Sequence, residues 1–101
     1  MSSVGGWSET FSATPEVQGI VDKVKPQLEE KDNKPYPVLV AITYKTQVVA
    51  GTNYLIKVSV SNSTDECVHL KVFQSLPHEK KGPSLTSYET GKTKNDPLKP
   101  F

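Results

Sequence analysis

Apolar residues recur with a helical spacing in the first third of the chain. The stripe consists of Val17, Ile20, Val21, Val24 and Leu28, whose spacings of three, four and seven residues place them on one face of a helix. Thr14-Pro15-Glu16 precedes it with a capping residue, a proline suited to the first turn and an acid that complements the helix dipole. Pro26 predicts a kink rather than an end, because the stripe continues beyond it. We therefore expect one kinked helix over residues 14–34.

After Pro37 the apolar residues alternate with more polar ones at a period of two. The runs cover residues 38–45, 54–60 and 68–73, with a weaker fourth run at 85–90. Turn-forming residues separate them at 50–52, 61–66 and 77–83. This pattern is typical of an antiparallel sheet covered on one side, and the helix is available to cover it. The expected fold class is α+β, with one kinked α-helix packed on a four- to five-stranded antiparallel sheet.

A chain of 101 residues accommodates a single domain, because a second hydrophobic core would need roughly another 50 residues. The expected order is an N-terminal trunk (1–13), the helix (14–34), antiparallel strands (38–90) and a C-terminal tail (91–101). The trunk is small and polar, with Trp7 and Phe11 as anchors, and such a terminus is mobile unless something ties it down. The tail is expected to be loosely held, with Phe101 as its bulky anchor.

Charge and cysteine usage exclude several classes of protein. The chain has 12 Lys+Arg against 11 Asp+Glu, a net charge of +1 that offers no basic face for nucleic acid. No stretch approaches the roughly 18 apolar residues of a membrane span, and the N-terminus lacks a signal-peptide pattern. The single cysteine, Cys67, cannot form an internal disulfide, which favours a reducing, cytoplasmic location. Neither nucleic acid nor a membrane is expected as a partner.

Cys67, His69 and His78 are the candidates for nucleophilic or metal chemistry. On a strand, Cys67 and His69 point to the same face about 6–7 Å apart, the arrangement of a nucleophile and its base. A hydrolase would also need an orienting group, an oxyanion hole and a cleft, for which this short chain has little material. A metal would need further ligands that the sequence does not place. We expect a small thiol at a strand start and surface histidines, with no enzyme activity, no metal and no cofactor.

The segment Gln47-Val48-Val49-Ala50-Gly51 is apolar where two strands must reverse. Hairpin tips normally carry Asn, Gly, Asp or Pro, so an exposed apolar tip indicates a binding surface. Alternatively, the turn lies slightly elsewhere and the valines lie inside the sheet. Leu76-Pro77-His78 repeats the theme at the next tight connection, and Gly5-Gly6 offers a backbone without obstructing side chains. If the three segments converge on one edge, they form a wedge suited to a narrow groove.

Residues 47–51 resemble the signature loop of the cystatin superfamily, and the chain resembles the stefins (type 1 cystatins) over nearly its whole length. The helix text from Ile20 to Lys31 carries this likeness, as do Tyr44-Lys45-Thr46 before the loop and Thr52-Asn53-Tyr54 after it. The absence of paired cysteines fits the stefins and not the secreted cystatins.

The resemblance implies a reversible, tight-binding inhibitor of papain-like cysteine proteases of the cathepsin L, H, B and S class. The implied protease-binding residues are Val4, Gly5 and Gly6 in the N-terminal segment, Gln47, Val48, Val49, Ala50 and Gly51 in the first loop, and Leu76, Pro77 and His78 in the second. The inhibitor would act as a monomer, with a domain-swapped dimer as a second state. The alternative is a non-inhibitory protein-binding or strand-exchange assembly protein of the same fold.

Overall fold

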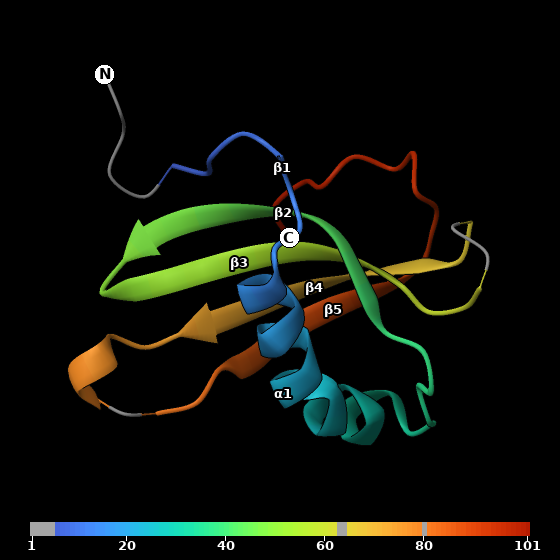
Figure 1. Ribbon diagram of the computed structural model, residues 1–101, viewed down its shortest axis with the longest axis horizontal. Coiled ribbons are helices and arrows are strands. Elements are labelled where there is room, and N and C mark those ends of the chain that lie inside the picture. The colour runs from blue at the N-terminus through green and yellow to red at the C-terminus, as the bar shows by residue number, and fades with distance from the viewer. Residues whose placement is uncertain (1–5, 63–64, 80) are drawn as a thin grey trace.

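The computed structural model of the protein describes residues 6–62, 65–79 and 81–101. Within these residues the chain forms one α-helix and one antiparallel sheet whose five strands neighbour each other in chain order (Figure 1). The elements are β1 (Phe11–Ser12), α1 (Pro15–Asp32), β2 (Val40–Val49), β3 (Gly51–Ser59), β4 (Cys67–Gln74), the 3₁₀ helix η1 (Pro77–Glu79) and β5 (Ser84–Lys92). The expected α+β class, one helix on an antiparallel sheet, is confirmed.

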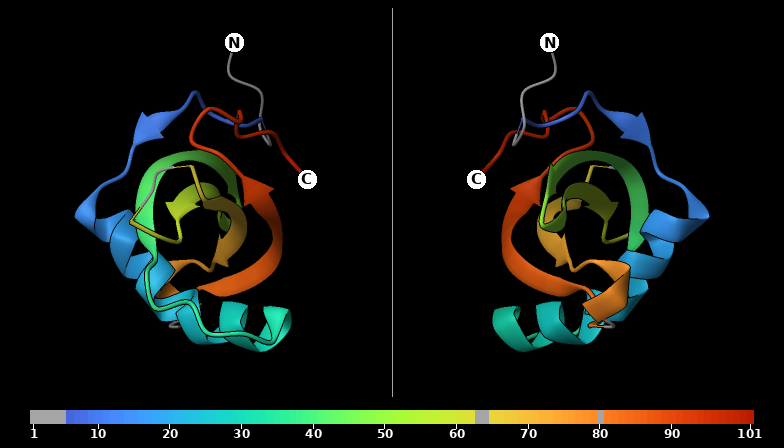
Figure 2. Two further views of the ribbon diagram at one scale, coloured as in Figure 1. Left: turned by 90° about the vertical axis from the view of Figure 1, so that its right-hand side faces the viewer. Right: turned by 90° about the vertical axis from the view of Figure 1, so that its left-hand side faces the viewer.

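Helix α1 begins and ends close to the predicted positions. Thr14 is its N-cap, and the Thr14 hydroxyl accepts a hydrogen bond from the backbone N–H of Val17 at 3.2 Å. It ends at Asn33, which adopts a left-handed conformation with φ 55°. The helix continues through Pro26, and its axis changes direction part-way along, as expected for a kinked helix (Figure 2).

The buried stripe of α1 packs on one face of the sheet. The core on this side includes Val21, Val24, Leu28, Ile56, Val58, Leu70 and Val72, all fully buried. Two glutamine side chains fasten the helix to the sheet. The Gln18 amide donates to the Leu39 carbonyl at 2.9 Å and accepts from the Ala41 N–H at 2.8 Å. Gln27 forms the same pair of bonds with the backbone at the entry to β5, so both flanks of the sheet are held to the helix.

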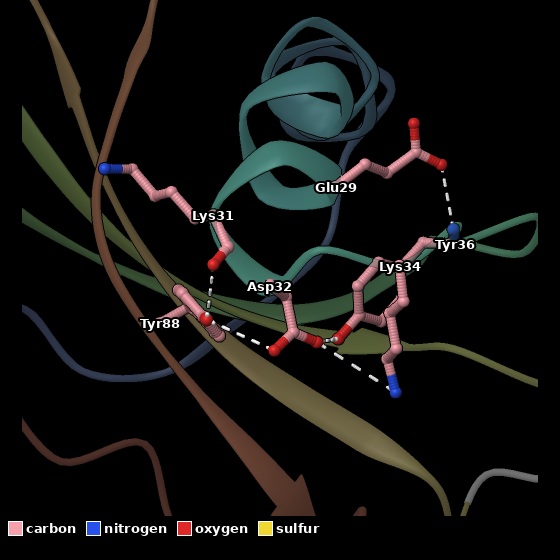
Figure 3. A network of polar contacts seen from close by, with 6 residues as sticks. All are labelled: Glu29, Lys31, Asp32, Lys34, Tyr36 and Tyr88. Carbon is pink, nitrogen blue, oxygen red and sulfur yellow. Dashed lines mark hydrogen bonds and ion pairs between the residues drawn. The ribbon is translucent and has the colours of Figure 1, made fainter.

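A polar network anchors the C-terminal end of α1 (Figure 3). The Asp32 carboxylate accepts hydrogen bonds from the hydroxyls of Tyr36 and of Tyr88, the latter at 3.2 Å, and the Lys34 ammonium lies 4.0 Å away. The backbone N–H of Tyr36 donates to the Glu29 carboxylate at 2.8 Å. Burial, followed by the hydrogen bond to Asp32, raises the pKa of Tyr36. The network joins the helix end, the segment that leaves it and β5.

The strict alternation expected along β2 is wrong. The pairing of β2 with β3 shifts between Ala41 and Thr43, and both Ala41 and Tyr44 pack against the core although they lie three residues apart. Val40, expected to share a face with Tyr44, is 54% exposed. A β-bulge explains the difference, because one extra residue reverses the faces of all residues beyond it.

The sheet is covered on both faces, not on one. The C-terminal tail lies on the side of the curved sheet away from α1 (Figure 2). Its buried anchor is Leu98, only 3% exposed, and not Phe101, which is half-buried. The Lys57 ammonium donates to the Lys94 carbonyl at 2.5 Å and further fixes the tail. His69, expected at the surface, is therefore 1% exposed.

The N-terminal trunk also differs from the expectation of a mobile segment. Phe11 and Ser12 pair with β2 as an edge strand, opposite Tyr44 and Thr43. The ring of Phe11 lies 5.8 Å from that of Tyr44, a contact typical of aromatic pairs. Over the described part of the chain, no helix is long and apolar enough to cross a membrane.

Candidate functional site

The predicted first loop is the end of a β-ladder. The paired positions are Gln47 with Asn53, Val48 with Thr52, and Val49 with Gly51, which leaves Ala50 at the turn. Val48 is nevertheless 70% exposed and Val49 39% exposed. The valines thus lie within the hydrogen-bonded hairpin, as the alternative expectation had it, and they also present apolar surface to solvent. We call residues 47–51 the hairpin tip.

Two features hold the hairpin tip in shape. The Asn53 side-chain amide donates to the Gln47 side-chain oxygen at 2.9 Å, across the two strands. Gly51 has φ +122°, and a Cβ there would lie 2.5 Å from the carbonyl oxygen of Gln74 and 2.9 Å from the Phe73 ring. Only glycine permits this conformation and this approach, so the end of β4 packs directly against the tip.

The second loop leaves the sheet beside the hairpin tip. It contains three predicted contact residues, Leu76, Pro77 and His78, of which His78 is exposed and Leu76 half-buried. Two side chains at its start, Gln74 and Ser75, both donate to the carbonyl of Lys81 at 3.2 Å and so close the loop. Since Thr52 pairs with Gln74, the loop begins next to the tip. Figure 1 shows η1 and the β2–β3 hairpin at the same end of the molecule.

The N-terminal segment approaches the same place. Val4 and Gly5 lie outside the described residues, whereas Gly6 is described and exposed. The next residue, Trp7, forms a β-bridge with Gln47 at the base of the tip. The described members of the three predicted segments therefore converge at one end of the sheet.

The residues that fix this arrangement were missed by the sequence analysis. Asn53 had no assigned role, and neither did Ser8, whose hydroxyl accepts a hydrogen bond from the Thr46 N–H at 3.0 Å. Ser8 and Thr46 are 38 positions apart, so no local pattern connects them. The missing information was how residues 6–13 align along β2.

Cys67 and His69 do not form a catalytic pair. They lie in the first half of β4, whereas the second loop follows the other end of this strand. Both are at most 2% exposed. Burial raises the pKa of the Cys67 thiol, which disfavours the thiolate, and lowers the pKa of His69 to about 4, which makes its imidazole a poor acceptor for the thiol proton. A cavity of about 250 Å³ opens beside Cys67 and contains none of the predicted contact residues. No cluster of three or more metal-ligating side chains occurs in the described residues.

We expect Cys67→Ser to leave the protease inhibition that the stefin resemblance implies unaltered, because the buried thiol is remote from the three segments. The variant should lose roughly 1–2 kcal/mol of stability, since a more polar hydroxyl replaces the thiol at a buried position. Titration against papain and thermal melting measure the two effects. Cys67→Ala is the matched control, and a folded Cys67→Ser that no longer inhibits would revive a thiol-based mechanism.

The chain is similar to several known proteins over most of its length. The cystatin domain family model matches residues 5–95. The chain is 54% identical over 99 residues to Stefin-C of Bos taurus, covering 98% of this chain and 96% of the relative. It is 57% identical to Cystatin-A and 55% identical to Cystatin-B, both of Homo sapiens, over 97 residues that cover 96% of this chain and 97% of each relative. A solved structure, the secreted type 1 cystatin from Fasciola hepatica, superposes with a TM-score of 0.71 at 31% identity, covering 88% of this chain and 98% of that chain.

The fold and these matches define the class of the protein. The chain belongs to the cystatin family, and within that family to the stefins. Its relatives are protease inhibitors and not enzymes, so the chain is a cysteine protease inhibitor and its partners are cysteine proteases.

Proposed function

We propose that the protein is a reversible, tight-binding inhibitor of papain-like cysteine proteases of the cathepsin L, H, B and S class. The proposed contact surface combines the N-terminal segment around Gly5 and Gly6, the hairpin tip and the Leu76–His78 loop. It fills the active-site cleft of the protease as a wedge and excludes the substrate. The inhibitor supplies no nucleophile and no cofactor.

The exposure of the hairpin tip is the observation that carries this proposal. Val48 is a β-branched residue of β2 and is 70% exposed, whereas residues 41–47 of the same strand are half-buried. Water contact at such a side chain is unfavourable, and the cost is removed when a partner covers it. Burying a fully exposed valine side chain contributes about 1.5–3 kcal/mol, and Val48 and Val49 contribute in proportion to the part of each side chain that is exposed in the free protein.

The rigidity of the tip favours tight binding. The tip is held by the ladder itself, by the Asn53–Gln47 bond and by the end of β4 behind Gly51. A surface that is ordered before binding loses little conformational entropy in the complex.

Val4, just before the glycines, enters a substrate-side pocket in this proposal, while the glycine backbone passes the protease nucleophile without a side chain.

The proposed inhibitory form is a cytoplasmic monomer. Stefins are intracellular type 1 cystatins, which supports this location, and a buried thiol such as Cys67 suits a reducing compartment. The monomer is required because exchange of strands between two copies would join β2 and β3 into one continuous strand. The tip would then no longer exist as a hairpin.

The test is a titration of papain, with a fluorogenic peptide substrate, by the wild type and by Val48→Asp. We expect the substitution to weaken inhibition by more than ~2 kcal/mol, roughly 30-fold, because a carboxylate cannot be buried in an apolar cleft without loss. The melting temperature should hardly change, since the side chain is exposed in the free inhibitor.

Val40→Asp is the matched control. Val40 is also an exposed valine of β2, but it lies at the opposite end of the strand from the tip. This variant should inhibit as well as the wild type. If Val48→Asp folds and keeps the wild-type inhibition constant, the hairpin tip is not part of the contact surface. A wild type that leaves papain fully active would overturn the proposal as a whole.

A further inference from the structure

The N-terminal arm, residues 6–13, runs antiparallel to β2, but its pairing register with β2 shifts by one residue along the way. Trp7 lies opposite Gln47 and Phe11 lies opposite Tyr44. Between these two pairs the arm advances by four residues and β2 by three. The arm therefore contains one extra residue. Such an insertion interrupts the ladder and leaves backbone groups of the partner strand without their regular partners.

Ser8 supplies hydrogen bonds to β2 at this interruption of the ladder. Its backbone N–H donates to the carbonyl of Thr46 at 2.8 Å, and its hydroxyl oxygen accepts from the N–H of Thr46 at 3.0 Å. The same hydroxyl donates to the carbonyl of Glu9 at 2.7 Å, which fixes its orientation. The hydroxyl oxygen thus takes the place of the main-chain carbonyl that a regular strand would present. Both backbone groups of Thr46 are satisfied by one residue of the arm.

The location of this contact gives it a consequence for binding. Thr46 immediately precedes Gln47, and Ser8 immediately follows Trp7, so the contact lies directly below the hairpin tip. We propose that Ser8 is a positioning residue for inhibition: its two hydrogen bonds to Thr46 hold Gly6 and Trp7 beside the hairpin tip, where the N-terminal part of the proposed contact surface meets the protease. This inference rests on the proposed function.

The remaining contacts of the arm are too few to do this alone. Beyond Ser8, the contacts of the arm with β2 include the two paired residues of β1, the ring contact of Phe11 with Tyr44, a bond from the Ala13 N–H to the Ile42 carbonyl and the Trp7 bridge. Most of these lie on the far side of the extra residue. Without the hydroxyl of Ser8, the arm before Glu9 would keep the Trp7 bridge, to which the bond from the Ser8 N–H to the Thr46 carbonyl belongs. This part of the arm would then be held less firmly, and more of its ordering would take place when the protease binds.

The first experiment compares the wild type, Ser8→Ala and Ser8→Thr as full-length chains against papain. We expect Ser8→Ala to dissociate about 5- to 10-fold faster, the size of one lost hydrogen bond, at an unchanged association rate. Ser8→Thr keeps a hydroxyl and should restore the wild-type rate. Ser12→Ala, an exposed serine of the same arm, is the matched control and should have no effect.

A double-mutant cycle separates positioning from simple stabilisation. Ser8→Ala is repeated in a chain that lacks residues 1–6, with thermal melting to verify that each variant is folded. If Ser8 acts through the arm, the substitution has no further effect once those residues are gone. An equal loss in both backgrounds would overturn the inference, as would a Ser8→Ala variant that dissociates like the wild type. A truncation that leaves inhibition unchanged would overturn it too, whereas a wild type without inhibition would overturn the proposed function first.

Discussion

Replacing Gly51 by alanine is expected to lower the melting temperature by roughly 10–20 °C and to abolish tight inhibition. A residue other than glycine at φ +122° costs about 1–3 kcal/mol in backbone strain. The added Cβ would also lie 2.5 Å from the backbone oxygen of Gln74, which cannot rotate away as the Phe73 ring can. Each kcal/mol lowers the melting temperature of a domain of this size by about 4–8 °C. Because the clash is at the tip itself, the surviving fold would present a displaced tip to the protease.

Gly91→Ala is the matched control for this prediction. Gly91 also has a positive φ, +70°, but nothing lies within 4 Å of the position its Cβ would take. It should lose only about 1–2 kcal/mol and inhibit normally. Size-exclusion chromatography after heating adds a second measurement, since opening the strained tip into a strand-exchanged dimer would relieve the clash in Gly51→Ala. A monomeric Gly51→Ala with wild-type melting and inhibition would contradict the close approach of β4 to the tip.

The three segments of the proposed site were predictable because their signals are local. Two adjacent valines at a reversal of the chain, a glycine pair and a short second connection can each be read from a few neighbouring residues. What positions them is not local. Ser8 contacts Thr46, and Gly51 must be glycine because of a carbonyl on another strand. Contacts of this kind depend on strand register, which alternation along one strand does not determine.

The fold class was predicted, and so was the helix ahead of the main strands, but neither β1 nor the faces of the sheet were. The helix stripe and the helix cap were found because each depends on residues that are close together in the sequence. The faces of β2 were not, because the bulge between Ala41 and Thr43 reverses the alternation without a glycine or proline to signal it. The outer face of the sheet looked polar, since Lys57 and His69 alternate with apolar residues. The tail covers it, anchored by Leu98 and a lysine–carbonyl bond, and that coverage is a long-range event.

The second large effect concerns pH. His69 is 1% exposed under the tail, and its Nε2 has no hydrogen-bond partner among the described residues. Burial, then the positive charges of Lys57 and Lys92, lowers its pKa to about 4, although Glu89 and Asp96 act in the opposite direction. An unfolded chain binds this proton at about pH 6.5, so between pH 6.5 and 4 the unfolded state holds more protons than the folded state. Stability must therefore fall as the pH falls through this window, and the contribution of His69 levels off below about pH 4.

We expect this group alone to remove roughly 2–3 kcal/mol of stability between pH 7 and pH 4.5. Denaturant unfolding at the two pH values measures this loss of stability. Glutamine cannot be protonated, so in His69→Gln the difference in stability between the two pH values should be smaller by that amount. This holds even if the substitution changes the stability at pH 7. The exposed His78 provides the control, because His78→Gln should retain the whole loss. If His69→Gln shows the same fall as the wild type, the imidazole is protonated in the folded protein and the tail does not seal it from water. If His69→Gln no longer loses this stability at pH 4.5, the acid sensitivity of the fold arises on the face of the sheet that the tail covers. It does not arise on the face that α1 covers, since His69 points away from that core.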